Sequence, residues 1–235
     1  ALGKINENTK VLDDYKFNEK YTFNSFVVGK SNQYVYFACK SVAENPAGQF
    51  NPLFIYGGVG LGKTHLMHAV GNKMLQNNPN CKILCVSAQN FMNDFTTAVR
   101  ENTYDQFNNK YHNVDALFID DVQYLCGDKR QIQNKLFEAF EKLVPYGKQI
   151  IFTSDTYARS LKAMDERLIS RFTSGLSVEV EPPELETRAM ILQKKAMANN
   201  FHLPDDVAFF IAKHLKSNVR ELEGALQRLM AYHMF

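Results

Sequence analysis

The chain has 235 residues, of which 45% are hydrophobic, and its formal net charge is +2. This length and composition suit one large domain, or a core with a small appendage, and the small net charge decides nothing about nucleic acid. No apolar run is long enough to cross a bilayer and residues 1–10 contain no signal-peptide core, so we expect a soluble cytoplasmic protein. The four scattered cysteines, Cys39, Cys81, Cys85 and Cys126, favour reduced thiols over a disulfide framework or a metal site.

The first part of the chain leads into a helix. Residues 1–20 are polar and have no regular period, which predicts the end of a linker. The aromatic side chains of residues 21–32 must pack against another element. Residues 32–45 then predict a helix, which Pro46 and Gly48 end.

A phosphate-binding loop, or Walker A motif, follows the first predicted strand. Residues 53–56 suit a buried strand, and residues 57–64 read GGVGLGKT, which fits G-x-x-x-x-G-K-[ST] at every defined position. Glycines let backbone N–H groups surround phosphate oxygens, and a helix beginning near Lys63 points the positive end of its dipole at the same anion. Lys63 is predicted to reach the β and γ phosphates and Thr64 to bind Mg²⁺. A glycine-rich turn that binds nothing does not explain strand, loop, Lys-Thr pair and helix in this order.

The nucleotide contacts predicted in and after this loop are Gly58, Gly60, Leu61, Gly62, Lys63, Thr64 and His65. His65 and His68 lie on the helix that leaves the loop, where packing or capping is expected rather than metal binding.

The next segment contains one helix more than a crossover needs. Residues 82–87 predict a second strand that is apolar on both faces, as a parallel sheet requires. Apolar side chains then repeat at helical spacing in two segments, at Phe91, Phe95 and Val99 and at Tyr104, Phe107 and Tyr111. Because one helix is enough to join parallel strands, we interpret residues 90–112 as an insertion.

Two strands end in polar residues. The run 116–121 ends in Asp120 and Asp121, a Walker B pattern in which Asp120 holds Mg²⁺, directly or through water, and Asp121 activates the attacking water. An Asp pair alone is as typical of a surface turn, but a phosphate loop in the same chain favours Walker B. The strand at 149–155 ends in Ser154 and Asp155, and both ends should share the carboxyl edge of one parallel sheet.

The remaining third of the chain becomes helical. Arg167 and Arg171 lie four residues apart on a short predicted helix, consistent with a solvated basic face or with an arginine finger that reaches a neighbouring subunit's γ-phosphate. After a strand at 176–180, Pro182 and Pro183 break the chain, and three further helices are expected. This predicts an α/β nucleotide-binding core over residues 21–181 and a small helical lid over residues 182–235.

Six segments, YTFNSFVVGKSN, NPLFIYGGVGLGKTHL, VDALFIDDVQ, RLISRF, PPELETR and SNVRELEGAL, occur in this order. Together they resemble the AAA+ ATPase domain of the DnaA family, the bacterial chromosomal replication initiators. The resemblance implies a P-loop AAA+ core with a five-stranded parallel sheet, a three-helix lid, and ATP or ADP with Mg²⁺ between them. It also implies ATP-bound subunits that assemble into a helical oligomer and help to open the origin. The doubled helix at 90–112 resembles the initiator-specific insertion that makes the assembly a spiral rather than a flat ring.

The resemblance also implies roles for single residues. Val28, Gly29 and Asn32 resemble the adenine-side segment, Asp155 the first sensor, Arg171 the arginine finger, Arg220 the second sensor, and Arg167 a supporting assembly residue. Thr96 and the Lys129–Arg130 pair fall near the family's contacts with single-stranded DNA. The catalytic set implied is Asp120, Asp121, Asp155, Arg171 and Arg220.

The chain departs from the general AAA+ pattern in one respect and from the family's pattern in two. The usual Walker B motif ends in Asp-Glu, whereas Asp120-Asp121 is normal for the initiator branch and fits slow hydrolysis, because the shorter side chain holds the attacking water less well. Thr96 replaces an apolar residue of the family. The family's C-terminal helix-turn-helix domain, which reads duplex origin DNA, is absent from this sequence, so we expect a domain of a longer, nucleoid-associated protein that works with the replicative helicase machinery.

Two other functions stay open. An AAA+ regulator or helicase loader would use the same core to act on another protein, and a full-length gene that continues into a basic helix-turn-helix would decide against it. The second alternative is a nucleotide-binding scaffold with negligible catalysis. Single-turnover ATP hydrolysis measured with and without Asp121 distinguishes such a scaffold from an ATPase.

Overall fold

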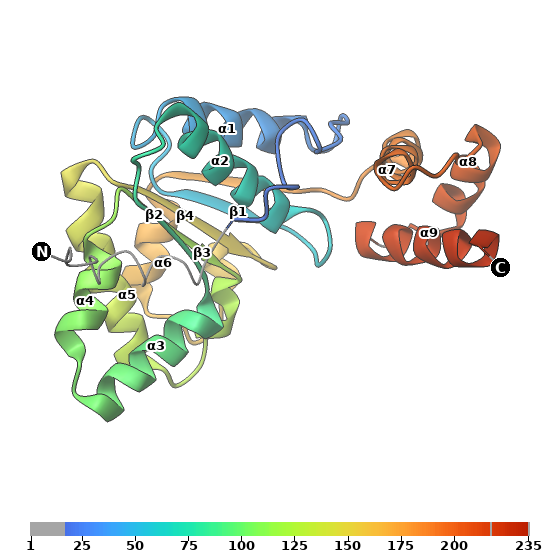
Figure 1. The fold of residues 1–235 in the computed structure, drawn as a ribbon. Helices are drawn as coiled ribbons and strands as arrows, with labels where there is room; N and C mark the ends of the chain where they lie inside the picture. The colour runs from blue at the N-terminus through green and yellow to red at the C-terminus, as the bar shows by residue number, and fades with distance from the viewer. Residues whose placement is uncertain (1–16, 217, 235) are drawn as a thin grey trace, which may run out of the picture.

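Five parallel strands form the centre of the molecule. The computed structural model describes residues 17–216 and 218–234 (Figure 1). The strands are β1 (Leu53–Tyr56), β2 (Ile83–Ser87), β3 (Ala116–Asp120), β4 (Gln149–Ser154) and β5 (Leu176–Glu179), in the spatial order β2-β3-β4-β1-β5. All four neighbouring pairs are parallel. The predicted five-stranded parallel sheet is therefore confirmed.

Helices cover both faces of this sheet (Figure 1). In chain order the helices are α1 (Gln33–Glu44), α2 (Lys63–Asn77), α3 (Ala88–Glu101), α4 (Tyr104–His112), α5 (Arg130–Leu143), α6 (Glu166–Thr173), α7 (Leu185–Ala198), α8 (Asp205–His214) and α9 (Val219–Met234). Short 3-10 turns are η2 (Val122–Leu125), η3 (Val144–Tyr146) and η4 (Ala158–Ser160). No helix of the described residues is long and apolar enough to span a membrane.

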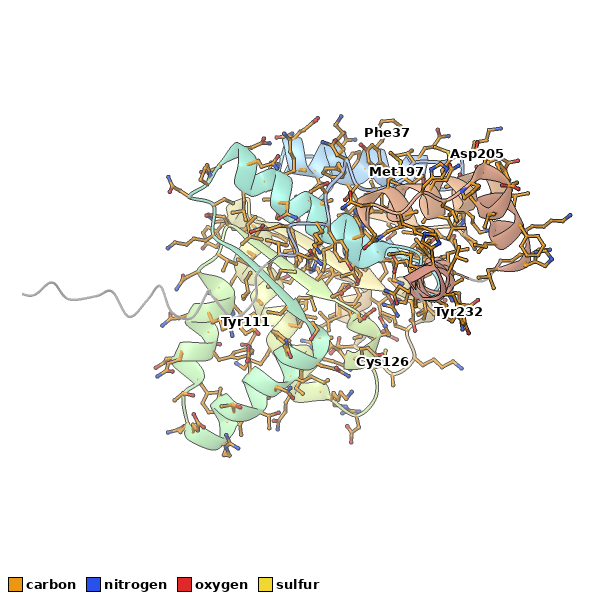
Figure 2. All side chains as sticks on the ribbon, turned by 45° about the vertical axis from the view of Figure 1, so that its right-hand side comes forward. Phe37, Tyr111, Cys126, Met197, Asp205 and Tyr232 are labelled. Carbon is orange, nitrogen blue, oxygen red and sulfur yellow. The ribbon has the colours of Figure 1, made fainter. Side chains whose placement is uncertain are left out.

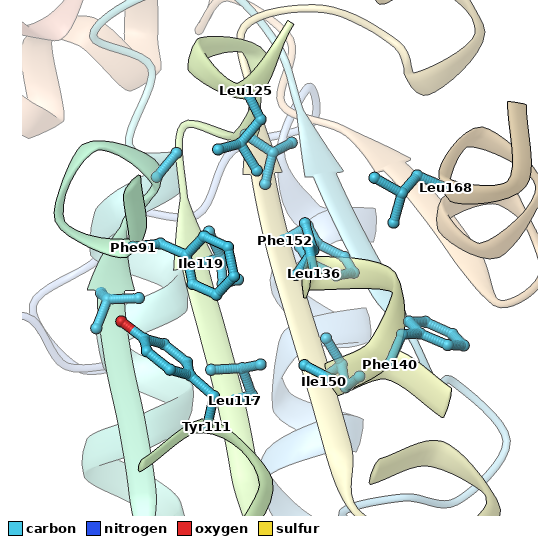
Figure 3. Packing of buried hydrophobic residues seen from close by; sticks show 14 of the residues in the cluster. Phe91, Tyr111, Leu117, Ile119, Leu125, Leu136, Phe140, Ile150, Phe152 and Leu168 are labelled. Carbon is cyan, nitrogen blue, oxygen red and sulfur yellow. The ribbon is translucent and has the colours of Figure 1, made fainter. Parts of the chain in front are cut away.

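The alternation of side chains along each strand divides the core into two layers. Leu53 and Ile55 of β1 pack with α1 and α2, while Phe54 between them packs on the opposite face with α3, α5 and α6. Figure 3 shows this second layer, where Leu117 and Phe152 face α5. Because both faces are buried, the strands consist mainly of apolar residues and their polar residues lie mostly toward the strand ends, which explains the continuous hydrophobic runs in the sequence.

The doubled helix packs through aromatic rings. Phe91 of α3 lies with its ring centroid 4.8 Å from that of Tyr111 and 5.5 Å from that of Phe107 on α4, both at steep angles. The predicted stripes are wrong at two positions, because Val99 is 42% exposed, with Ala98 buried in its place, and Tyr104 is 38% exposed. A spacing of exactly four residues drifts off a face that repeats every 3.6 residues.

The three C-terminal helices form a separate body with its own small core, which includes Ala189, Leu192, Ala208, Ala212, Leu222 and Leu226. This lid stands beside the sheet in Figure 1, and exposed Met197 and Tyr232 lie on it in Figure 2. Its helix α7 is attached to residues 24–31 of the core. Lys194 donates to the carbonyl of Asn24, and the carboxylate of Glu184 accepts from the Lys30 N–H at 2.9 Å.

The predicted linker spans residues 1–20, and its residues 1–16 lie outside the described residues. Phe17 packs edge-on against His68 and Phe118, with centroids 5.4 and 5.8 Å apart. Asn72 donates to the carbonyl of Asn18 at 3.0 Å. Residues 17–20 thus lie against α2.

Replacing Gln133 by leucine should destabilise the fold by about 1–3 kcal/mol. This side chain is 3% exposed, donates to the carbonyls of Leu125 and Ala163 at 2.8 and 3.1 Å, and accepts from the Asp165 N–H at 2.9 Å. Leucine leaves those buried backbone groups without partners. Urea unfolding of Gln133→Leu beside Gln131→Leu, an exposed glutamine of the same helix, measures the difference; equal stability of the two variants would contradict the expectation.

Candidate nucleotide-binding site

The carboxyl ends of the strands open into a cavity of about 230 Å³ between the sheet and the lid. In the strand register Tyr56 lies opposite Ser154, Ser87 opposite Asp120 and Ile119 opposite Phe152, so the ends of β1, β2, β3 and β4 fall within one residue of the same level. The cavity is lined by Tyr21, Ser25, Phe26, Val27, Asn32, residues 59–65, Asp121, Gln123, Tyr124, Asp155, Glu181, Pro183, Ile191, Lys195, Val219, Arg220 and Glu223.

The loop between β1 and α2 has the backbone that a phosphate cradle needs. Gly60 and Gly62 have φ angles of +74° and +100°, a region that side chains disfavour. Because α2 begins at Lys63, its free N–H groups are directed at the cavity. Lys63 is 7% exposed and its ammonium group donates to the carbonyls of Gly57 and Gly58, both at 2.8 Å. Burial lowers the pKa of Lys63, an effect that Asp121 and Asp120 oppose.

Asp120 is held between two hydroxyl groups from different elements. Thr64 of α2 donates to its Oδ2 at 2.9 Å, and Thr153 of β4 donates to its Oδ1. The Thr153 oxygen also accepts from the Asp121 N–H at 2.8 Å. Burial raises the pKa of Asp120, and the hydrogen bonds from Thr153 and Thr64 act against that shift.

The residues at this point fit Mg²⁺. Magnesium is held in nucleotide sites by one or two protein oxygens, with phosphate oxygens and water completing its coordination. Thr64 and Asp120 already place a hydroxyl and a carboxylate oxygen together. No cluster of three or more His, Cys, Asp or Glu side chains suited to a metal occurs in the described part of the chain, so a site for a metal bound by protein alone is not found there.

Asp121 and Asp155 meet at the cavity wall through a residue that sequence patterns did not single out. Gln123 donates to Oδ1 of Asp121 at 3.0 Å and accepts from the Asp155 N–H at 3.3 Å. Asp121 itself has φ 59° and ψ 53°, a left-handed conformation that aspartate tolerates better than most residues. The motif that carried the resemblance contains Gln123, but no local signal in it distinguishes this glutamine from a surface residue.

The lid contributes the opposite wall. The Val219 N–H at the start of α9 donates to the Gly60 carbonyl at 3.1 Å, and a Cβ atom on Gly60 would lie 3.2 Å from Cγ of Arg220. Arg220 is thereby brought to the phosphate loop, 157 positions after Lys63 in the chain. Lys195 and Glu223 also line the cavity and form an ion pair of 2.6 Å, which the sequence did not predict.

Of the three predicted adenine-side residues, one lines the cavity and two do not. Asn32 lines the cavity, but its amide accepts from the Gly29 N–H at 2.8 Å and donates to the Val27 carbonyl at 3.0 Å, so it shapes the segment 27–32. Val28 is 37% exposed and Gly29 packs against Thr187 of α7, and neither belongs to the cavity wall. Val27 is the wall residue of this segment instead.

His65 supports the same wall. Its ring stacks on Tyr21 with centroids 4.8 Å apart, and its Nε2 lies 2.9 Å from the Thr22 carbonyl and 3.2 Å from the Ser25 hydroxyl. Burial lowers the pKa of His65. Its predicted packing role is consistent with these contacts, and it also lines the cavity.

Arg171 lies elsewhere on the molecule. Its guanidinium pairs with Glu141 at 2.8 Å and lies 5.7 Å from the ring centroid of Phe140. Arg167, one turn earlier on α6, pairs with Asp165 at 2.7 Å and lies over Phe137. The structure therefore brings Asp120, Asp121, Asp155 and Arg220 together and leaves Arg171 outside their cavity.

A second hollow, of about 500 Å³, joins two segments far apart in the sequence. It is lined by Phe95, Thr96, Val99, Asp128, Lys129, Arg130, Gln131 and Ile132. Thr96 thus lies beside the Lys129–Arg130 pair.

A parallel sheet with a phosphate loop, paired carboxylates at the end of β3 and a helical lid whose arginine faces that loop defines an AAA+ ATPase domain. The family model described as the bacterial DnaA ATPase domain matches residues 17–179. The chain is 53% identical over 229 residues to the chromosomal replication initiator protein DnaA of Herminiimonas arsenicoxydans. The aligned region covers 97% of this chain and 50% of that protein. The chain belongs to the bacterial DnaA ATPase domain family.

Solved structures agree with this assignment. Domain III of the Thermotoga maritima replication initiation protein DnaA matches with a TM-score of 0.89 and 42% identity, over 92% of this chain and 90% of that chain. A replication initiator DnaA bound to AMPPCP and single-stranded DNA matches with a TM-score of 0.84 and 36% identity, over 91% and 66%. The predicted family and AAA+ fold are confirmed. The chain spans about half the length of the curated relatives it matches.

Replacing Thr153 by valine should destabilise the domain by about 1–3 kcal/mol, because the Asp121 N–H and the Asp120 carboxylate both lose a partner. Nucleotide affinity should also become less dependent on Mg²⁺. Urea unfolding and calorimetric titration with and without Mg²⁺ measure the two effects.

Thr173→Val is the matched control, because the Thr173 hydroxyl donates to the carbonyls of Ile169 and Ser170 in its own helix. If both valine variants behave alike, Thr153 has no special role at the site.

Proposed function

We propose that this domain is an ATP-dependent assembly switch of replication initiation, with slow ATP hydrolysis as its off-step. The observation that carries the proposal is the separation of the two arginines. Arg220 faces the phosphate loop of its own chain, whereas Arg171 lies outside the cavity on α6. A complete site would then need a second subunit to supply Arg171.

The residues at the cavity have different roles in binding and hydrolysing ATP. Lys63 and the N–H groups at the start of α2 bind the β and γ phosphates, and Arg220 contacts the γ-phosphate from the lid. Thr64 and Asp120 hold Mg²⁺, which when bound neutralises charge on the phosphate oxygens. Asp121 orients the attacking water and Asp155 senses the γ-phosphate. Because an aspartate reaches less far than a glutamate, hydrolysis is slow.

Contact with DNA is proposed for the second hollow. Lys129 and Arg130 bring two positive charges to its rim, and backbone phosphates are recognised through such groups. The relative solved with AMPPCP and single-stranded DNA supports a role in binding the separated origin strand. In the longer protein we place duplex recognition and contact with the replicative helicase machinery outside this chain, in the bacterial cytoplasm at the nucleoid.

Two alternatives are less well supported. Family membership favours an initiator over a helicase loader or a regulator of another protein. A scaffold without catalysis would still use Thr64 and Asp120 for Mg²⁺, but it would give no role to the Asp121 carboxylate that Gln123 holds beside Asp155. Single-turnover hydrolysis by Asp121→Asn distinguishes it, because a scaffold would not respond.

Lys63→Ala should weaken ATP binding at least about tenfold, because the phosphates lose a nearly buried positive charge. Calorimetric titration of ATP measures the change. Lys40→Ala, an exposed lysine of α1, should bind as the unaltered domain does. Unchanged affinity in Lys63→Ala would exclude the phosphate-loop assignment.

Arg171→Ala should bind ATP normally as a monomer and fail to form ATP-dependent oligomers on single-stranded DNA. Each subunit junction loses a charge-assisted contact with a γ-phosphate, worth about 1.5–3 kcal/mol. Sedimentation with ATP and with ADP measures assembly, and Arg228→Ala, an exposed arginine of α9, is the control. Weaker ATP binding by monomeric Arg171→Ala, or assembly equal to that of the control, would reject the arginine finger.

A further inference from the structure

Gln123 occupies a fixed position between two carboxylate-bearing segments of the cavity. The 3-10 turn η2 is anchored on both sides of it by Val122 and Leu125, which are fully buried. This anchoring places Gln123 and Tyr124 on the cavity wall. The position of the Gln123 backbone therefore does not depend on the hydrogen bonds of its side chain.

The side chain of Gln123 is chemically suited to the place. Asp121 offers a carboxylate oxygen, which can only accept, and Asp155 offers a backbone N–H, which can only donate. The distances are 3.0 Å from Nε2 to Oδ1 of Asp121 and 3.3 Å from the Asp155 nitrogen to Oε1. The primary amide of glutamine carries an N–H donor and a carbonyl acceptor side by side, so one amide orientation satisfies both partners.

Other side chains at position 123 would lose part of this bridge. A glutamate could keep the acceptor for the Asp155 N–H, but it would set a second carboxylate against Asp121. A methionine has a similar length and supplies neither group. Among the described residues, Gln123 donates the one hydrogen bond that the Asp121 carboxylate accepts from a side chain. The backbone of Asp121 is held separately, because its N–H donates to the Thr153 hydroxyl.

We propose that Gln123 is a positioning residue for ATP hydrolysis: it directs the Asp121 carboxylate and ties it to the segment that carries Asp155. The proposal rests on the proposed function of Asp121. Gln123 acts through Asp121 and takes no part in binding Mg²⁺ or phosphate. Loss of the bridge lets the carboxylate turn away from the position in which it orients water, and small misplacements of this kind lower rates strongly.

The experiment compares Gln123→Met and Gln123→Glu with a matched control, Gln76→Met, which alters an exposed glutamine of α2. Single-turnover ATP hydrolysis should slow about tenfold to hundredfold in both variants at position 123. Calorimetric affinity for ATP and ADP should stay within about threefold in Gln123→Met, because no phosphate contact is removed. A residue with a merely structural role would change affinity and stability together with the rate.

Two further measurements address the bridge itself. In an Asp121→Asn background, Gln123→Met should slow hydrolysis no further, since the two residues act as a unit. In the nucleotide-free domain, NMR should show the Gln123 side-chain amide signals moving on Asp121→Asn and the Asp155 amide exchanging faster in Gln123→Met.

The outcomes separate this proposal from the one on which it rests. If Asp121→Asn hydrolyses ATP at the unaltered rate, the proposed role of Asp121 fails. If Asp121→Asn is slow while Gln123→Met keeps the normal rate, Gln123 is not a positioning residue. If Gln123→Met does not fold, Gln123→Glu decides, because it keeps the contact to Asp155 and its normal rate would equally overturn the proposal.

Discussion

The structure depends above all on how one carboxylate, that of Asp120, is taken out of water. A desolvated carboxylate is costly unless hydrogen bonds replace its hydration. Thr64 from α2 and Thr153 from β4 supply those bonds, so the carboxylate joins the phosphate-loop helix to two strands. A slip of β4 by one residue would turn Thr153 to the other face of the sheet and remove its hydrogen bond to Asp120, leaving Thr64 to replace the lost hydration. The same bonds that fix the strand register therefore fix the place at which Mg²⁺ can be held.

The phosphate loop, the Asp120–Asp121 pair and the order of elements were predictable because each is encoded by neighbouring residues. Strands buried on both faces and a glycine-rich turn leave a pattern that needs no knowledge of the fold. The lid side of the cavity was harder to predict from the sequence. Lys195 and Glu223 become wall residues only because α7 and α9 pack together, and an ion pair 28 positions apart leaves no periodic signal. For Val28 the sequence identified the right segment, but the local turn held by Asn32 presents Val27 to the cavity.

The lid is attached on both sides of the cavity by few polar contacts. On one side the Val219 N–H meets the Gly60 carbonyl, and on the other Glu184 accepts from the Lys30 N–H and the Ser31 hydroxyl. Between these attachments the lid has a core of its own. A body with its own core and a small polar boundary can move as a unit. A nucleotide that touches both the loop and Arg220 would thus bias the position of the whole lid rather than of one side chain.

The surroundings of Arg171 orient its guanidinium group on the surface but bind it only weakly. Its partner Glu141 is as exposed as the arginine itself, with 41% of each side chain accessible, and exposed pairs of this kind contribute about 0–1 kcal/mol. The rings of Phe137 and Phe140 meanwhile restrict the guanidinium without satisfying its donors. A γ-phosphate on a neighbouring subunit would offer stronger, charge-assisted hydrogen bonds. Under the proposed function, exchange of Glu141 for that phosphate would be favourable only with ATP, because with ADP the Glu141 carboxylate would remain the partner of Arg171.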